Sequence, residues 1–121
     1  AETVVVYENT AAAVGSGALE VFSTPSMIAL MEKASRELVQ PYLEEGQSTV
    51  GTRLEVSHVA ASPIGAHIRA ESTLVEIDRR MLTFEVKAYA DGELIGEGRH
   101  QRCIIYAERF MEKALAKQKK A

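Results

Sequence analysis

The length, composition and charge of the chain exclude several classes of protein. Its 121 residues suffice for one domain, which we expect to span residues 1–121, because domains typically contain about 100–200 residues. Fourteen Lys and Arg and 17 Asp and Glu are interleaved and give a net charge of −3, so a basic nucleic-acid-binding surface is not expected.

Cysteine usage and hydropathy indicate the cellular setting. The lone Cys103 cannot form an internal disulfide and has no partners at zinc-finger spacing, which is typical of a reducing, cytoplasmic protein. The run from Ala11 to Phe22 is broken by Gly and Glu and lacks a preceding basic segment, unlike a signal peptide. No stretch approaches the roughly 18 apolar residues of a membrane span. We therefore expect a soluble protein with no membrane partner.

The first third of the chain predicts an edge strand and a long helix. The strand covers Thr3 to Tyr7 and the helix Thr24 to Gln40. Thr24 is a favoured N-cap, Pro25 fits the first helical position, and Pro41 disfavours helix at the residue before it. The apolar positions at helical spacing are Met27, Leu30, Met31, Ala34 and Leu38.

Four long strands with alternating apolar and polar residues follow. They begin near Val50, Ala66, Leu82 and Glu93, with the last ending at Tyr106. Short connections, including a strong hairpin signal at Asp91–Gly92, imply antiparallel neighbours with one covered face. The residues expected on that face are Val50, Thr52, Leu54, Val56, His58 and Ala60; Ala66, Ile68, Ala70, Ser72 and Leu74; Leu82, Phe84, Val86 and Ala88; and Leu94, Gly96, Gly98, His100, Arg102, Ile104 and Tyr106.

The end of the chain predicts a surface helix from Ala107 to about Lys119. This helix is expected to bury Phe110, Met111, Ala114 and Leu115. One helix covered by a long, curved antiparallel sheet is a two-layer α+β domain.

Polar residues on the covered face are the candidates for chemistry. His58 lies near a strand end on that face, although a lone histidine there is more often structural. Arg102 requires an anion, which could be Glu32, another carboxylate or a ligand phosphate. Gly96 and Gly98 beside it could admit a ligand or allow close packing of the helix.

Thr24 and Glu32 have ordinary structural explanations when each is taken alone. Thr24 can be a helix cap, and Glu32 a solvated charge. The helix start could also stabilise an oxyanion, with the N–H groups of Ser26 and Met27 as donors. Eight residues of helix separate Thr24 from Glu32 by about 12 Å, so a third group such as His58 would have to connect them.

The chain resembles the hotdog-fold thioesterases, specifically the fluoroacetyl-CoA thioesterase group. The matching segments are "VFSTPSMIALME", "PYLEEGQSTVGT", "VSHVAASPIG" and "IGEGRHQR". This resemblance implies a hotdog fold, a catalytic Thr24, Glu32 and His58, and substrate contacts at Gly51 and Arg102. Thr24 would act as nucleophile or position a water, His58 as general base, and Glu32 would orient the imidazole or attack the carbonyl itself.

The resemblance also implies a homodimer with its site at the interface, an acyl-CoA substrate, and no metal or organic cofactor. Fluoroacetyl-specific enzymes carry a phenylalanine in a lid segment, whereas this chain has "VGSGALE" with Ala18 at the equivalent place. We therefore expect hydrolysis of an acyl-CoA with a short or small acyl group. Alternatives are a non-catalytic acyl-CoA or small-ligand binding protein and a hotdog enoyl-CoA hydratase or dehydratase.

Overall fold

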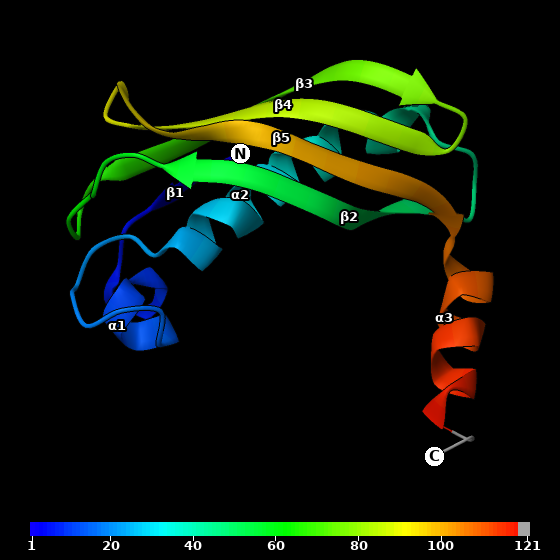
Figure 1. Cartoon of the computed structure of the whole chain (residues 1–121), viewed down its shortest axis with the longest axis horizontal. Helices are drawn as coiled ribbons and strands as arrows, with labels where there is room; N and C mark the ends of the chain where they lie inside the picture. Colours follow the sequence, from blue (N-terminus) through cyan, green and yellow to red (C-terminus); the bar gives the residue numbers. More distant parts are fainter. Residues whose placement is uncertain (119–121) are drawn as a thin grey trace.

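A computed structural model describes residues 1–118, in which a curved antiparallel sheet covers one long helix (Figure 1). The strands occur in the order β1-β3-β4-β5-β2, so β2 forms an outer edge of the sheet. Helix α2 lies along the concave face, which confirms the predicted two-layer arrangement. The elements are β1 (Glu2–Val4), η1 (Tyr7–Asn9), α1 (Ala11–Val14), α2 (Thr24–Val39), η2 (Gln40–Tyr42), β2 (Gln47–His58), β3 (His67–Asp78), β4 (Met81–Ala90), β5 (Glu93–Tyr106) and α3 (Ala107–Ala116).

The N-terminal strand is shorter than predicted. It pairs antiparallel with β3 at the edge of the sheet, as expected, but ends at Val4. A 3-10 turn at Tyr7–Asn9 occupies the end of the predicted strand. There the Asn9 side chain hydrogen-bonds Val6 N and Val4 O, and such local side-chain bonds compete with strand pairing.

Helix α2 begins at Thr24, but its N-cap is Ser23 and not Thr24. The Ser23 hydroxyl accepts a hydrogen bond from Ser26 N. The prediction of Thr24 as the cap was therefore wrong by one residue, because two adjacent residues have suitable side chains. The consequence is that the Thr24 hydroxyl is not used by the helix.

The buried stripe of α2 also differs at its end. Leu38 is exposed, whereas Ser35 and Val39 are buried. The Ser35 hydroxyl is satisfied by Met31 O and by the Ser72 hydroxyl of β3, so a polar residue holds a core position. The sequence pattern missed it because buried serine is recognisable only through its partner.

Two β-bulges displace residues from their predicted faces. In β2 a bulge between Gly51 and Arg53 brings Thr49 and Gly51 to the helix-facing side, in place of Val50 and Thr52. Beyond it, the predicted face of β2 pairs with the helix-facing residues of β5. A second bulge between Ala88 and Tyr89 similarly buries Ile95 in place of the predicted Leu94. An extra residue in one strand reverses the in/out alternation that follows it.

The central part of the sheet follows the prediction. The alternating residues of β3 and β4 form the core with α2, among them Ile68, Phe84 and Val86. Asp91 and Gly92 both have positive φ, as the predicted two-residue hairpin requires.

Helix α3 overturns the prediction that it packs on its own domain. No residue of α3 is buried, and Phe110, Met111 and Leu115 are 41%, 52% and 53% exposed. The helix projects from the end of β5, on the same side of the sheet as α2 (Figure 1). The predicted end near Lys119 lies outside the described residues.

Candidate active site

The Thr24 hydroxyl and the His58 imidazole meet where α2 begins and β2 ends. Thr24 Oγ1 lies 2.8 Å from His58 Nδ1. Since Ser23 caps the helix, the Thr24 hydroxyl can donate its proton to this nitrogen. A hydroxyl hydrogen-bonded to an imidazole is the first half of a nucleophile–base pair.

The environment of His58 favours a neutral ring. Burial lowers the pKa of His58 from its ordinary value of 6.5, and the backbone of Ala60 partly offsets this effect. Nε2 is buried and has no hydrogen-bond partner among the described residues. If Nδ1 accepts the hydroxyl proton, Nε2 must carry the imidazole proton and present it to an acceptor.

A hollow opens directly beside this pair. It has a volume of about 300 Å³ and is lined by residues on three segments, from Ala11 to Ser16, from Val21 to Thr24 and from His58 to Ala61. Its walls include Phe22 and the small side chains of Ala60 and Ala61. A small apolar group could therefore lie next to Thr24.

Arg102 lies in a second cluster near the middle of the sheet. Its guanidinium donates to Thr49 Oγ1 at 2.7 Å and to Thr49 O at 2.9 Å, and Nη1 lies 3.2 Å from His100 Nε2. Nδ1 of His100 is 2.8 Å from Arg53 O. His100 is therefore neutral, with Nδ1 as donor and Nε2 as acceptor.

Glu32 is the anion that faces Arg102. Glu32 Oε2 is 3.6 Å from Arg102 Nη1, and the Glu32 side chain is 36% exposed. This contact is an ion pair without a close hydrogen bond, because Thr49 and His100 already bind the guanidinium. Of the anions considered for Arg102, the structure places Glu32 there.

Gly51 allows Glu32 to occupy this place. A Cβ on Gly51 would lie 2.7 Å from Glu32 Oε2 and 3.2 Å from His100 Cε1. Gly51 and Arg102 are also directly paired between β2 and β5. The residues predicted as substrate contacts therefore lie together, beside Glu32.

The two clusters are separate within one chain. Thr24 and Glu32 are about 12 Å apart along α2, and Gly51 and His58 about 23 Å apart along β2. Among the described residues, no hydrogen bond or ion pair links Glu32 to Thr24 or His58. A single subunit therefore does not assemble all three predicted catalytic side chains.

Two local expectations are decided by packing. The N–H groups of Ser26 and Met27 donate to Ser23 Oγ and Ser23 O, respectively, so the predicted oxyanion donors are already occupied.

Gly96 packs closely against Met27 of α2, since a Cβ added at Gly96 would lie 2.4 Å from Met27 Sδ. An added Cβ on Gly98 would lie 2.1 Å from Glu55 O of β2. Both glycines therefore permit close packing.

Sequence reasoning missed two members of the Arg102 cluster. Thr49 was missed because the bulge in β2 places it on the covered face. His100 was predicted to be covered but was given no role. Its position two residues before Arg102 on the same strand face was the available signal.

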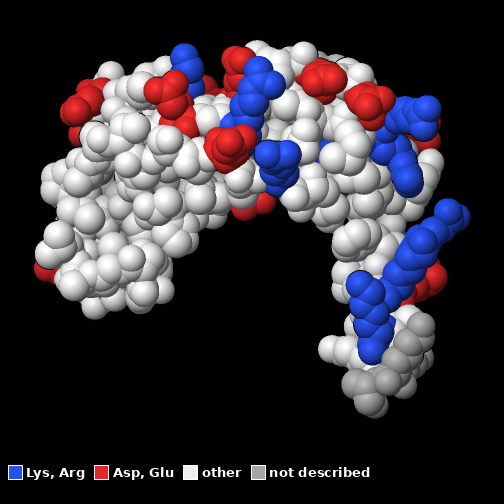
Figure 2. Space-filling view, in the orientation of Figure 1, with Lys and Arg blue, Asp and Glu red and all other residues white. Residues whose placement is uncertain are grey.

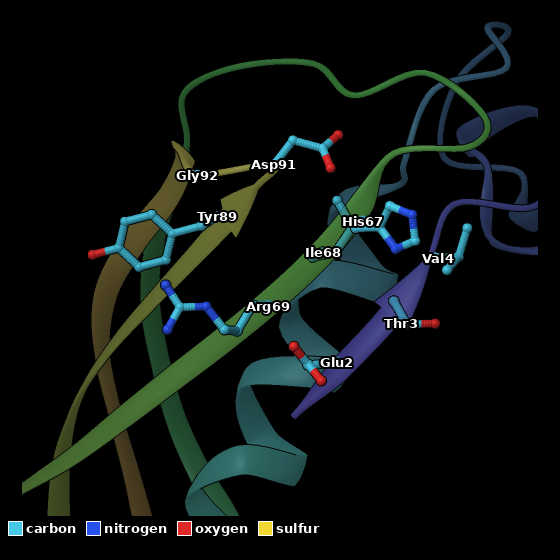
Figure 3. Close-up of a pocket in the computed structure, with 9 residues that line it drawn as sticks. All are labelled: Glu2, Thr3, Val4, His67, Ile68, Arg69, Tyr89, Asp91 and Gly92. Atoms are coloured by element: carbon cyan, nitrogen blue, oxygen red, sulfur yellow. The ribbon is translucent and has the colours of Figure 1, made fainter.

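Another hollow, of about 470 Å³, lies over β1, β3 and β4 (Figure 3). Arg69 and Tyr89 point toward one another there, with the guanidinium carbon 5.2 Å from the ring centroid. Arg69 also pairs with Glu71. These side chains are mutually satisfied on the polar face of the sheet, so this hollow is a weaker candidate. No cluster of three potential metal ligands occurs within residues 1–118.

The family of fluoroacetyl-CoA-specific thioesterases, FlK, matches residues 5–108 of the chain. The chain belongs to this family. It is 38% identical over 98 residues to a fluoroacetyl-CoA thioesterase from Streptantibioticus cattleyicolor, covering 81% of this chain and 70% of that protein.

Solved structures support the same assignment. One is a mutant of the fluoroacetyl-CoA-specific thioesterase FlK in complex with fluoroacetate and CoA; it has a TM-score of 0.91 and 33% identity and covers 97% of this chain and 96% of that chain. A hot-dog-like protein from Thermanaerovibrio acidaminovorans has a TM-score of 0.87 at 21% identity, covering 97% and 87% of the two chains, which supports the fold alone. These comparisons confirm the prediction of an acyl-CoA thioesterase with a hotdog fold.

No helix among the described residues is long and apolar enough to cross a membrane. The absence of a nucleic-acid partner and of a cofactor stays a prediction.

Proposed function

We propose that the chain hydrolyses small acyl-CoA thioesters with Thr24 as nucleophile, His58 as general base, and Glu32 of the partner subunit as the group that orients His58. The observation that carries this proposal is the 2.8 Å contact between Thr24 Oγ1 and His58 Nδ1, which leaves Nε2 without a hydrogen-bond partner among the described residues. A nucleophile and base of this kind require a third group on the far ring nitrogen.

The reaction has two chemical steps. The Thr24 hydroxyl transfers its proton to His58 Nδ1 while its oxygen attacks the thioester carbonyl; the C–S bond then breaks, and the imidazolium returns the proton to the CoA thiolate. Water, deprotonated by His58, next attacks the acyl-threonine ester. The bond between the acyl carbon and Thr24 Oγ1 breaks, giving the carboxylic acid, and the His58 imidazolium returns its proton to Oγ1, which restores the hydroxyl.

A second copy of the chain would supply the missing carboxylate. The outer edge of β2 carries no paired strand among the described residues, and Leu54 on its inner face is 37% exposed. Two-fold symmetry would join two β2 edges antiparallel. Pairing about the strand centre places Gly51 of the partner subunit opposite Leu54. Within one subunit, Gly51 and His58 are about 23 Å apart along β2, whereas Gly51 of the partner subunit would be only about 13 Å from His58 along the strand. The Glu32 side chain beside that Gly51 can span part of this distance.

The hollow favours a small acyl group without selection for fluorine. Its volume of about 300 Å³ and its Ala60 and Ala61 walls suit a short chain. The lid residue Ala18 is exposed and lacks the aromatic ring of fluoroacetyl-specific relatives. We therefore propose that the chain hydrolyses acetyl-CoA and fluoroacetyl-CoA at comparable rates. We also propose a cytoplasmic location, and that Arg102 holds Glu32 in place and does not bind a phosphate of the substrate.

Release of free CoA thiol from acyl-CoAs of increasing chain length tests the activity. A short-chain optimum is expected. Tight acyl-CoA binding without thiol release would indicate a binding protein. Consumption of enoyl-CoA with the thioester intact would indicate a hydratase.

Mixed dimers test the shared site. His58→Ala and Glu32→Gln variants should each have strongly reduced activity as homodimers, yet equimolar co-refolding should restore about a quarter of wild-type sites, because half the dimers then contain one complete site. No recovery would show that Glu32 does not act across the interface.

An acyl group trapped on Thr24 and detected by mass spectrometry would identify the nucleophile, whereas its absence in single-turnover samples would favour direct attack by water.

A further inference from the structure

Helix α3 carries an apolar stripe that its own subunit does not cover. The stripe contains Phe110, Met111, Ala114 and Leu115, which fall within about 140° of the helix circumference at 100° per residue. Acidic Glu108 and Glu112 lie on one flank of this stripe, and basic residues on the other. A helix with so defined an apolar face is normally packed on a partner.

The basic flank of α3 faces residues of its own subunit. The Arg109 guanidinium stacks over the Tyr106 ring, with 5.8 Å between guanidinium carbon and ring centroid. Arg109 and Lys113 line one hollow with Arg80 from the β3–β4 turn, and Phe110 at the border of the stripe also reaches it. Figure 2 shows the side of α3 that faces the arch beneath the sheet as mostly uncharged, with charged side chains on its front and outer sides. The side of α3 that faces the arch therefore offers a mostly uncharged surface.

The base of α3 is joined to the start of β2. Ala107 N donates to Gly46 O at 2.9 Å, and Tyr106 pairs with Gln47. In a two-fold dimer joined through β2, the start of one β2 lies beside the end of the other. The start of β2 carries α3, and the end carries His58.

We propose that α3 of each subunit packs on the partner and completes the wall of the partner's Thr24–His58 hollow; this inference rests on the proposed function. Val59, which lines that hollow, is 57% exposed, and Val14 and Leu19 of the N-terminal segment that supplies Ala11, Ser16 and Val21 to its wall are 45% and 69% exposed. A second copy therefore has matching apolar surfaces on α3 and around the hollow. Contact between them excludes water from the acyl group, which strengthens the electrostatic interactions of the reaction.

The test uses the double variant Met111→Ala with Leu115→Ala. It should fold, since α3 has no buried residue, and it should remain dimeric through β2. We expect kcat/KM for a short acyl-CoA to fall about fivefold or more, because water enters the hollow. Glu112→Ala, on the acidic flank of the same helix, is the matched control and should retain wild-type activity.

Mixing the double variant with His58→Ala decides where α3 acts. In the mixed dimer, the intact Thr24–His58 pair of one subunit meets the intact α3 of the other, so activity should rise above that of both parent homodimers. Unchanged activity in the double variant, or a loss that mixing does not restore, would overturn the inference. The His58→Ala and Glu32→Gln mixture is run in parallel; recovery there alone would refute the role of α3 while leaving the shared catalytic site intact.

Discussion

Thr24 Oγ1 lies 2.8 Å from His58 Nδ1, although 34 residues separate the two in the sequence. The contact exists because Ser23, and not Thr24, caps α2, and because β2 ends at His58 beside the start of that helix. Adjacent hydroxyl side chains therefore have different roles, and substitutions can distinguish them.

Thr24→Val should reduce kcat by about 10²-fold or more, since the base then has no hydroxyl to activate, while thermal stability stays within about 0.5 kcal/mol of wild type. Thr24→Ser should keep most activity. Ser23→Ala should show the opposite pattern, with about 1 kcal/mol lost on removal of the cap and the chemistry retained. Steady-state kinetics and denaturant unfolding measure both quantities; a strongly destabilised Thr24→Val would contradict the division of roles.

The pH dependence of kcat/KM should report the charge of His58. The general base must be neutral, so the rate falls as pH decreases through its pKa. Burial lowers the pKa of His58, whereas a carboxylate at Nε2 would raise it. In the Glu32→Gln variant, the fall of the remaining kcat/KM at acidic pH should therefore occur at lower pH than in the wild type. Glu55→Gln on β2 is the control and should leave it in place; an unshifted fall in Glu32→Gln would count against contact between Glu32 and His58.

Buried His100 should make stability depend on pH. Burial lowers its pKa from 6.5; neighbouring Arg102 acts in the same direction, and the carbonyl of Arg53 and the carboxylate of Glu32 oppose it. The unfolded chain then binds more protons than the folded one, so stability is full above pH 6.5 and is lost as pH falls toward the lowered pKa. Urea unfolding between pH 4.5 and 8 should show this loss. His100→Gln, which cannot titrate, should reduce the slope, and an unchanged slope would exclude His100 as its source.

Gly51→Ala should affect activity more than stability. The added Cβ would meet Glu32 Oε2 at 2.7 Å, and the end of a partly exposed side chain can move away at small cost. Displacement of the catalytic carboxylate should lower kcat by about tenfold or more, with less than about 1.5 kcal/mol of destabilisation. Gly98→Ala provides the contrast, since its Cβ would meet Glu55 O at 2.1 Å and should mainly destabilise the sheet. Equal losses of stability in the two variants would contradict this assignment.

Periodicity predicted most of the sheet, because most side chains of β3, β4 and β5 follow a two-residue alternation that burial enforces. The predicted bounds of β5 match the structure at both ends. The predicted faces were wrong at the bulges near Gly51 and Ala88, where an extra residue enters one strand. No residue type in the sequence marks these two bulges.

The sequence by itself determined the α+β fold, the start of α2 and the covered position of His58, because hydrophobic period, proline and hairpin signals act locally. The family pattern pointed to Thr24, Glu32 and His58 together. Tertiary structure decided that Thr24 meets His58 while Glu32 meets Arg102, because these contacts depend on the β2–β5 register and on the bulge that turns Gly51 toward the helix. It also decided that α3 leaves its apolar stripe uncovered. Amphipathic spacing predicts that a helix face will be covered, but the direction in which the chain leaves β5 determines which surface can cover it.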